Sequence, residues 1–285
     1  MRVPLPVSDC LIDWGKWNNA TEVYVDTHNK IASIIVPKSG STYTSSLCDN
    51  NAITRFVGID HKDHDVYRAN LLGSMDIQTR INLIANHLSD YQFFQIIREP
   101  ISRFVSGLAQ AVSMYYQKQL RLDSYTDSEL REFLDRVPLT VYMERSYQGP
   151  EEYSDLCRNI SGNDHLMTQT WFINQLPTHP DDVVWFTLDD AFSDNFYDWH
   201  QTSNNFKHFG NRRFHEKHNG HDELDYKQEG DDNFLKFFEV RRRMYNVITE
   251  YIKSPQVISD LENIYQSDRE LWENTKKIAY KAKVL

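Results

Sequence analysis

The chain has 285 residues, and its 31 lysines and arginines against 41 aspartates and glutamates give a net charge of −10. With 40% hydrophobic and 13% aromatic residues, a chain of this length can bury a sizeable core, which excludes intrinsic disorder as its main state. The acidic balance argues against a protein that coats DNA or RNA, because such binding needs many lysine and arginine contacts to phosphate.

Cysteine content and hydropathy limit the cellular setting. The three cysteines, Cys10, Cys48 and Cys157, are an odd number at wide spacing, which provides neither a disulfide framework nor a zinc site made of cysteine alone. The N-terminal sequence lacks the apolar segment of a signal peptide, and no apolar run reaches the length needed to cross a bilayer. We therefore expect a cytoplasmic protein with no membrane partner.

The first predicted strand is a continuous apolar, β-branched run at residues 31–36, the pattern of a strand buried on both faces. Residues 37–40 interrupt it. The hydroxyl-rich residues 41–47 then favour the start of a helix, because serine and threonine are preferred at helix N-caps.

The same order recurs further on. Apolar residues at steps of four, three and four predict a helix over residues 77–88, and a second apolar run predicts a strand at residues 93–97. Pro100 suits the first turn of a helix, which apolar spacing extends over residues 101–116. Strands that alternate with helices in this way predict parallel pairing.

The second half of the chain adds further elements. Thr126 to Glu129 have the pattern of a capping box before a helix, residues 183–188 predict a third strand, and residues 233–251 and 257–281 have helical periodicity. An acidic, loop-like segment begins at residue 219.

These patterns predict the fold class. We expect an α/β protein with a central parallel sheet flanked by helices and a helical C-terminal extension. We expect one domain over residues 1–285, with the α/β core at about 30–218 and the helical part at about 230–285.

Two strand-to-helix turns carry cations at the edge of the sheet where ligands bind. In the first, Gly40 lets the backbone approach a ligand, the N–H groups of Ser41 to Tyr43 open a helix, and Lys38 adds a positive charge. In the second, Arg98 ends a strand and Ser106 follows it by eight residues. The two turns together predict a ligand with two separate anionic groups.

Common nucleotide-binding motifs are missing from the sequence. The lysine of the first turn precedes its only glycine, whereas a Walker motif places lysine after the second glycine. No G-x-G-x-x-G motif occurs either. Ordinary P-loop and Rossmann dinucleotide sites are therefore disfavoured.

The two turns resemble motifs of the sulfotransferase family. Residues Val36 to Tyr43 are similar to the family's 5′-phosphosulfate loop, and residues Ile97 to Ser106 are similar to its 3′-phosphate motif, with the R-x-P-x-x-R-x-x-S spacing intact. The resemblance implies a P-loop-like sulfotransferase fold. It also implies transfer of a sulfuryl group from 3′-phosphoadenosine 5′-phosphosulfate (PAPS) to an acceptor, with 3′-phosphoadenosine 5′-phosphate (PAP) as the product and no metal.

Three later segments are similar to the carbohydrate branch of the family, whose Golgi members share such patterns. Residues Asn163 to Gln169 resemble the branch's H-x-x-x-Q segment, residues Phe186 to Asp190 its later core strand, and residues Leu261 to Asp268 its C-terminal helix. The resemblance, which covers residues 30 to 272, implies in-line displacement by an acceptor hydroxyl, with carbohydrate as the acceptor class. The expected partner is thus a glycan or a small molecule.

The resemblance also implies residue roles. Lys38 is expected to neutralise charge on the oxygen that bridges phosphorus and sulfur, and Arg98 and Ser106 are expected to bind the 3′-phosphate. The 5′-phosphate is expected to be held by the loop residues Ser39, Gly40, Ser41, Thr42 and Tyr43. Cytosolic members usually carry tryptophan at the position of Tyr43.

The acceptor hydroxyl needs a base, and histidine titrates in the right range. His61 and His64 are the predicted bases, because related 2-O-sulfotransferases use a histidine between the two phosphate motifs. His87 is a further candidate, although a helix over residues 77–88 would end away from the ligand edge. His165 is the last candidate base, and the alternative is that it is a packed residue with a structural role.

Two alternatives stay open from the sequence. One is an ATP-dependent phosphoryl-transfer enzyme, which would require magnesium. The other is a catalytically inactive module that binds a nucleotide or a glycan, which the tyrosine at position 43 and the lack of an unambiguous base would favour.

Overall fold

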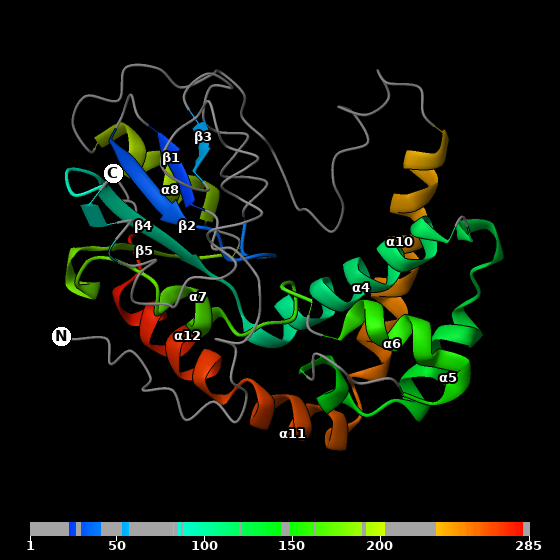
Figure 1. Cartoon of the computed structure of the whole chain (residues 1–285). Coiled ribbons are helices and arrows are strands. Elements are labelled where there is room, and N and C mark those ends of the chain that lie inside the picture. The colour runs from blue at the N-terminus through cyan, green and yellow to red at the C-terminus, as the bar shows by residue number, and fades with distance from the viewer. Residues whose placement is uncertain are drawn as a thin grey trace. The chain divides into compact units, whose positions relative to one another are not determined.

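The chain folds into two units, and each is built from segments that are distant in sequence. The structure is a computed structural model that describes residues 23–26, 30–40, 53–56, 82, 85–86, 88–119, 121–143, 149–161, 163–189, 192–202 and 232–281 (Figure 1). Unit 1 comprises Met1–Pro100, Thr168–Phe214 and Ser267–Leu285, and unit 2 comprises Ile101–Met167 and His215–Gln266. The expected single domain over residues 1–285, with its α/β core at about 30–218 and its helical part at about 230–285, stays a prediction.

Unit 1 contains a five-stranded sheet in the order β3-β1-β2-β4-β5 (Figure 1). The strands are β1 (Val23–Asp26), β2 (Ile31–Ile34), β3 (Ile53–Phe56), β4 (Gln92–Ile97) and β5 (Val184–Thr187). The predicted parallel sheet is confirmed, because β2 pairs with β4 and β4 with β5 in parallel.

The sheet also has an antiparallel part that the sequence did not predict. Strand β1 pairs antiparallel with both β2 and β3. Only residues 27–30 separate β1 from β2, and so short a link joins antiparallel neighbours, whereas parallel neighbours need a crossover of a dozen or more residues. The sheet is therefore mixed.

Aromatic side chains fill the core on one face of the parallel strands. Phe94 of β4 and Phe186 of β5 pack against Phe196 and Trp199 of α8 (Phe192–Thr202). The Phe94 and Phe196 ring centroids lie 5.2 Å apart and those of Phe186 and Trp199 lie 5.4 Å apart, within the range of favourable aromatic pairs. This packing fixes β4 and β5 against α8.

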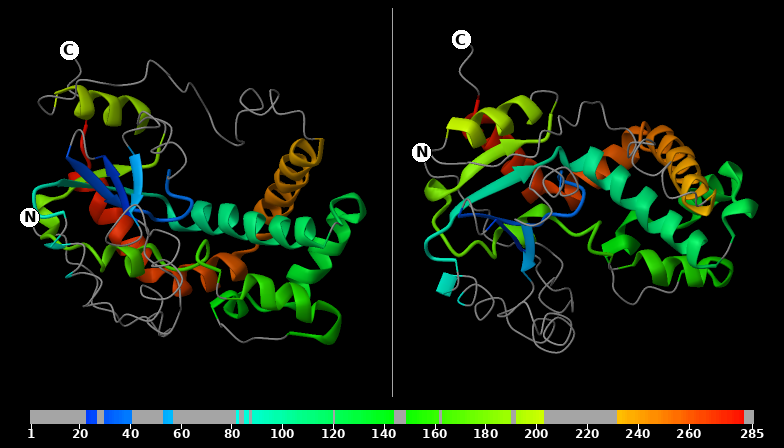
Figure 2. Two further views of the ribbon diagram at one scale, coloured as in Figure 1. Left: turned by 45° about the horizontal axis from the view of Figure 1, so that its top comes forward. Right: turned by 90° about the horizontal axis from the view of Figure 1, so that it is seen from above.

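Two further helices of unit 1 lie side by side. These are α7 (Gln169–Ile173) and α12 (Gln266–Ile278), which hydrogen bonds join near their N-terminal ends (Figures 1 and 2). After α12, the Tyr280 N–H donates to the carbonyl of Trp185 in β5 at 2.8 Å. A short 3₁₀ helix, η6 (Pro180–Asp182), precedes β5.

Unit 2 is helical in the part that the structure describes. Its helices are α4 (Pro100–Lys118), α5 (Asp127–Arg136), α6 (Ser154–Ile160), α10 (Asp232–Tyr251) and α11 (Pro255–Ile264), with 3₁₀ turns η3 (Leu122–Ser124), η4 (Leu139–Met143) and η5 (Glu151–Tyr153). Helix α4 begins at Pro100, as its fixed φ predicts.

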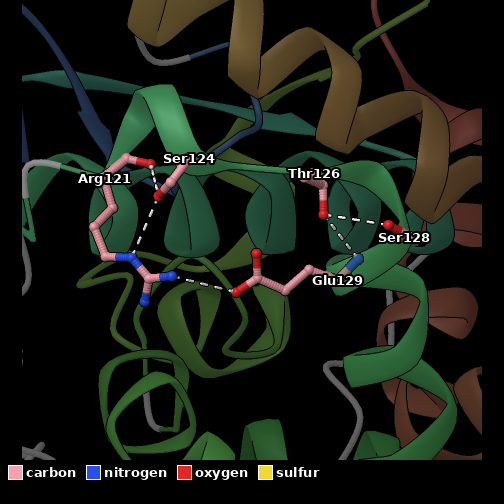
Figure 3. Close-up of polar contacts among 5 residues, drawn as sticks. All are labelled: Arg121, Ser124, Thr126, Ser128 and Glu129. Carbon is pink, nitrogen blue, oxygen red and sulfur yellow. Dashed lines mark hydrogen bonds and ion pairs between the residues drawn. The ribbon is translucent and has the colours of Figure 1, made fainter.

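Local sequence signals explain where α5 begins. The hydroxyl of Thr126 accepts a hydrogen bond from the Glu129 N–H at 3.2 Å, and Glu129 also faces Arg121 (Figure 3). The N-cap role of Thr126 is therefore confirmed, whereas the Glu129 carboxylate, the other half of a capping box, is directed at Arg121.

The C-terminal helical stretch differs from its prediction. Instead of one helical run over residues 257–281, the chain forms α11 and α12, which meet at Tyr265. The Tyr265 side chain is buried and its hydroxyl donates to the carbonyl of Leu166. This long-range anchor accompanies the break in the helix, and the apolar periodicity alone does not reveal it.

The predicted helices over 41–47 and 77–88 lie largely outside the described residues. Among the helices that are described, none combines the length and the apolar character required to cross a membrane.

Candidate functional site

The carboxyl ends of the three parallel strands meet at one edge of unit 1. Lys38 follows β2, Arg98 follows β4 and Asp189 follows β5. The Leu188 N–H donates to the carbonyl of Ile97 at 2.8 Å, which extends the pairing of β4 and β5 toward the loops. Open α/β sheets bind their ligands at this edge.

The Lys38 loop begins with a tight turn. The Ser39 N–H donates to the carbonyl of Val36 at 3.1 Å, Pro37 occupies the second position, and Lys38 has a φ of +65°. Proline followed by a positive φ is the pattern of a type II turn, where glycine normally takes the third position. A side chain in this left-handed conformation costs about 1–2 kcal/mol, and such strain concentrates at functional sites.

Gly40 directly follows this turn and has a φ of +79°. A Cβ at this position would lie 3.4 Å from Cδ1 of Leu188 and 3.6 Å from side-chain atoms of Ile96. Both the backbone conformation and the neighbouring side chains therefore favour glycine here.

The structure places the side chain of Arg98 against the backbone of the Lys38 loop. Nη1 of Arg98 donates to the carbonyl oxygen of Lys38 at 3.2 Å, and both side chains are partly buried. The guanidinium therefore lies against the Lys38 loop, and the two turns form one cationic region at the sheet edge.

A glutamine from α7 joins the same two turns. Oε1 of Gln169 accepts hydrogen bonds from the Ser39 hydroxyl at 2.9 Å and from the Arg98 N–H at 3.0 Å. Nε2 of Gln169 donates to the Arg98 carbonyl at 2.8 Å. Gln169 is fully buried; its bond to Ser39 is buried as well, and its two bonds to Arg98 are partly buried.

The backbone of Gln169 is held by a carboxylate of α12. Oδ2 of Asp268 accepts from the Gln169 N–H at 2.8 Å, and Oδ1 accepts from the N–H and the hydroxyl of Thr170 at 2.9 and 3.1 Å. Asp268 is fully buried. The charge of its carboxylate is thus compensated by donors at the N-terminus of α7, as buried charges require.

One predicted base lies in unit 2 beside a carboxylate. Nδ1 of His165 lies 2.6 Å from Oδ1 of Asp164. An ionised carboxylate can only accept a hydrogen bond, so the His165 ring carries a proton on Nδ1 and, when neutral, has its lone pair on Nε2.

The pKa of Asp164 reflects this pairing. Burial by itself raises the pKa of the Asp164 carboxyl, but the hydrogen bond to His165 and the charges of His165 and Arg103 outweigh burial and hold the pKa below its usual value. The carboxylate is therefore ionised at neutral pH and fixes the orientation of the imidazole.

Comparison with protein families decides the identity of the fold. The sequence model of a protein family that is described as the sulfotransferase family matches residues 21–273, which is most of the chain. The chain belongs to the sulfotransferase family. No curated protein and no solved structure gives a significant match.

Membership of the sulfotransferase family confirms the resemblance seen in the two turns and identifies the chain as an enzyme. Of the residues predicted to bind the donor, Lys38, Ser39, Gly40 and Arg98 are described and lie at the sheet edge of unit 1. Both Ser39 donors are bonded within the protein, the N–H to Val36 and the hydroxyl to Gln169.

Other predicted residues of this sulfotransferase lie elsewhere. Ser106 is partly buried within α4 in unit 2. The remaining loop residues and three of the predicted bases fall outside the described residues: Ser41, Thr42, Tyr43, His61, His64 and His87.

Sequence reasoning did not assign a role to Gln169 or Asp268. Both lie within segments that resemble the carbohydrate branch of the sulfotransferases, and this placement was the available signal. In the described part of the chain, no three His, Cys, Asp or Glu side chains come close enough to hold a metal ion.

Proposed function

We propose that this sulfotransferase transfers a sulfuryl group from PAPS to an acceptor hydroxyl on a carbohydrate. The observation that carries the proposal is the hydrogen bond from the Arg98 guanidinium to the backbone carbonyl of Lys38, which joins the two cationic turns at the carboxyl edge of the parallel strands. Two cations on adjoining turns suit a donor with two separate anionic groups, and PAPS carries a 5′-phosphosulfate and a 3′-phosphate.

The residues present fit this donor. The Lys38 loop combines an ammonium group with two positive-φ residues, Lys38 and Gly40, just before the residues that are proposed to hold the 5′-phosphate. The guanidinium of Arg98 provides several donors for a phosphate. Ser106 is proposed to bind the same 3′-phosphate.

Lys38 performs the central chemical role in this proposal. PAPS, when bound, supplies the sulfuryl group. The Lys38 ammonium stabilises the negative charge that develops on the phosphate oxygen as its bond to sulfur breaks. The loop residues after Ser39, whose own two donors are bonded to Val36 and Gln169, hold the phosphate in line for displacement.

A histidine is proposed to accept the proton of the acceptor hydroxyl. His61 and His64 stay predictions from the sequence, and His165 is favoured by a specific observation, the hydrogen bond from Nδ1 to Asp164. That bond leaves Nε2 as the basic nitrogen of the neutral ring. The test compares the variants His61→Ala, His64→Ala and His165→Ala. The variant that lowers kcat without changing the affinity for PAP identifies the base.

Family membership favours sulfuryl transfer over the ATP-dependent alternative. The acceptor class is tested by incubating the enzyme with radiolabelled PAPS and panels of glycans and of small phenols. Label in the glycans supports the proposed acceptor, and label only in the phenols refutes it. The cytoplasmic location stays a prediction from the sequence.

Calorimetric titration with PAP, 5′-AMP and ATP in the presence of EDTA tests the donor. We expect PAP to bind tightest, and Arg98→Ala to weaken PAP binding by about 1.5–3 kcal/mol, the value of a charge-assisted hydrogen bond. Lys38→Ala should lower kcat by about 100-fold or more, as the removal of a group that stabilises developing charge does.

Lys277→Ala is a matched control, because Lys277 is an exposed lysine of α12 in the same unit. It should leave binding and turnover unchanged. Equal affinity for PAP and 5′-AMP in the wild-type protein, or unchanged turnover in both Lys38→Ala and Arg98→Ala, contradicts the proposed function.

A further inference from the structure

We propose that Gln169 is a positioning residue that sets the spacing between the Lys38 loop and the Arg98 turn, so that a donor with two anionic groups binds both at once. This inference rests on the proposed function. Its basis is the pair of contacts that one buried side chain makes, to the Ser39 hydroxyl of the first turn and to the Arg98 backbone of the second.

The Gln169 amide pairs with the Arg98 peptide groups as a neighbouring strand would. It accepts from the Arg98 N–H at 3.0 Å and donates to the Arg98 carbonyl at 2.8 Å. These bonds lie immediately beyond the end of β4, which is Ile97. Gln169 therefore fixes the backbone from which the Arg98 guanidinium extends.

Only an amide side chain can make this set of bonds. Oε1 accepts from two donors while Nε2 donates to a carbonyl, and glutamine has both an acceptor with two lone pairs and a donor. A glutamate would present an oxygen to the Arg98 carbonyl in place of the N–H, and an alanine would remove one hydrogen bond each from the Ser39 hydroxyl, the Arg98 N–H and the Arg98 carbonyl.

The second connection between the turns uses the Arg98 guanidinium, which the proposed function also assigns to ligand binding. It is the hydrogen bond from the Arg98 guanidinium to the Lys38 carbonyl at 3.2 Å. The proposed function assigns that guanidinium to a phosphate, for which it has further N–H donors. The Gln169 connection uses backbone and hydroxyl groups instead, so it does not depend on the side chain that is proposed to bind the ligand.

The position of Gln169 is itself fixed from α12. The Asp268 carboxylate accepts the N–H groups of Gln169 and Thr170, and all three residues are buried. The Gln169 side chain consequently extends from an anchored backbone, which a spacing role requires.

The inference makes a prediction that separates spacing from local damage. A ligand that joins two anions gains affinity because the second contact is intramolecular, and this gain requires the correct distance between the sites. In Gln169→Ala, PAP affinity should fall about tenfold or more, because that gain is lost. The affinities for 5′-AMP and 3′-AMP, each of which has one phosphate, should change less than about twofold, because each turn keeps its own donors.

Ser39→Ala removes the bridge at its other end with a smaller change to the core. It should also weaken PAP selectively and leave 5′-AMP binding unchanged, since the Ser39 hydroxyl is bonded to Gln169. If the hydroxyl binds the 5′-phosphate instead, Ser39→Ala lowers the affinities for 5′-AMP and PAP together, and the inference fails.

Gln95→Met provides the matched control. Gln95 is a fully buried glutamine on β4 of the same unit, and its side-chain amide has no hydrogen-bond partner among the described residues. Methionine has a similar shape, so this variant should bind all three nucleotides as the wild type does.

The experiment is calorimetric titration of the full chain and its variants with PAP, 5′-AMP and 3′-AMP, with tryptophan fluorescence to confirm folding. Selective loss of PAP affinity in Gln169→Ala and Ser39→Ala supports the inference. Unchanged PAP affinity, or parallel loss for all three ligands, overturns it. If the wild type binds PAP no tighter than the two monophosphates, the proposed function fails instead.

Discussion

Replacing Asp268 by alanine removes a fully buried carboxylate that anchors α7 to α12. The Gln169 and Thr170 N–H groups, bonded to Asp268 at 2.8 and 2.9 Å, lose their acceptor. The Thr170 hydroxyl loses less, because the Ser267 hydroxyl lies 3.1 Å away and can take its bond. Two buried backbone donors are therefore left without a partner.

The magnitude follows from these two donors. Each buried donor without a partner costs about 1–3 kcal/mol, so the pair accounts for about 2–6 kcal/mol. Removing the charge also removes the cost of burying it, which offsets part of this loss. We expect Asp268→Ala to lower the free energy of unfolding by about 3 kcal/mol, and Asp268→Asn, which keeps one acceptor oxygen, by about half as much.

Tryptophan fluorescence is the appropriate probe in a urea titration. The segments of unit 1 contain Asp268 and every tryptophan of the chain, at positions Trp14, Trp17, Trp171, Trp185, Trp199 and Trp272. The signal therefore reports on the unit in which the bonds are lost. The slope of the free energy against urea should match that of the wild type if the exposed surface is unchanged.

Glu273→Ala is the control for this prediction, because Glu273 lies on α12 in the same unit as Asp268 and the tryptophans. Its exposed carboxylate accepts hydrogen bonds from the Lys276 side chain, and the loss of this contact should change stability by less than about 0.5 kcal/mol. A cost below about 1 kcal/mol for Asp268→Ala, or a cost equal to that of the control, would refute the reasoning.

Three further predictions concern the turn, the histidine and helix α4. Lys38→Gly should be about 1 kcal/mol more stable than Lys38→Ala in a urea titration, because glycine relieves the left-handed φ of +65°; equal stabilities would contradict the observed turn. The lowered pKa of Asp164 contributes stability that is present above the unfolded-state value of about 4 and is lost as the pH falls through the folded-state value. The urea midpoint of Asp164→Asn should thus lie below that of the wild type at pH 7, and the two midpoints should converge on acidification. When both proteins also carry His165→Gln, the difference between their midpoints should no longer depend on pH. A difference that is independent of pH with His165 present would argue against the pair. In Gly107→Ala, the new Cβ would lie 2.4 Å from the carbonyl oxygen of His165, so thermal melting should show a loss of about 1–3 kcal/mol despite the higher helix propensity of alanine; a gain in stability would disprove the close contact.

Local signals were sufficient to predict the parallel strands and the helix that follows β4. The strands that form β2, β4 and β5 are short apolar runs that suit burial on both faces, and Pro100 marks the start of α4. The Thr126 cap of α5 is a contact within one turn. In each case the residues that determine the structure are neighbours in the chain, so the sequence determined the fold class and the order of these elements by itself.

The candidate site was predictable only as far as its motifs are local. Lys38, Gly40 and Arg98 were located from the two strand-to-helix turns. The left-handed φ at Lys38 was not predicted, because a lysine at a turn position that glycine usually occupies gives no local signal for this conformation.

Tertiary structure decided how the turns are joined. The contacts of Gln169 with Ser39 and Arg98 span 130 and 71 residues, and the contact of Gln169 with Asp268 spans 99 residues. The pairing of β1 with β3 and the hydrogen bond from Tyr265 to Leu166 also join residues that are distant in the sequence. Hydrogen bonds act over about 3 Å regardless of sequence separation, and so only the folded chain selects which buried donor meets which acceptor.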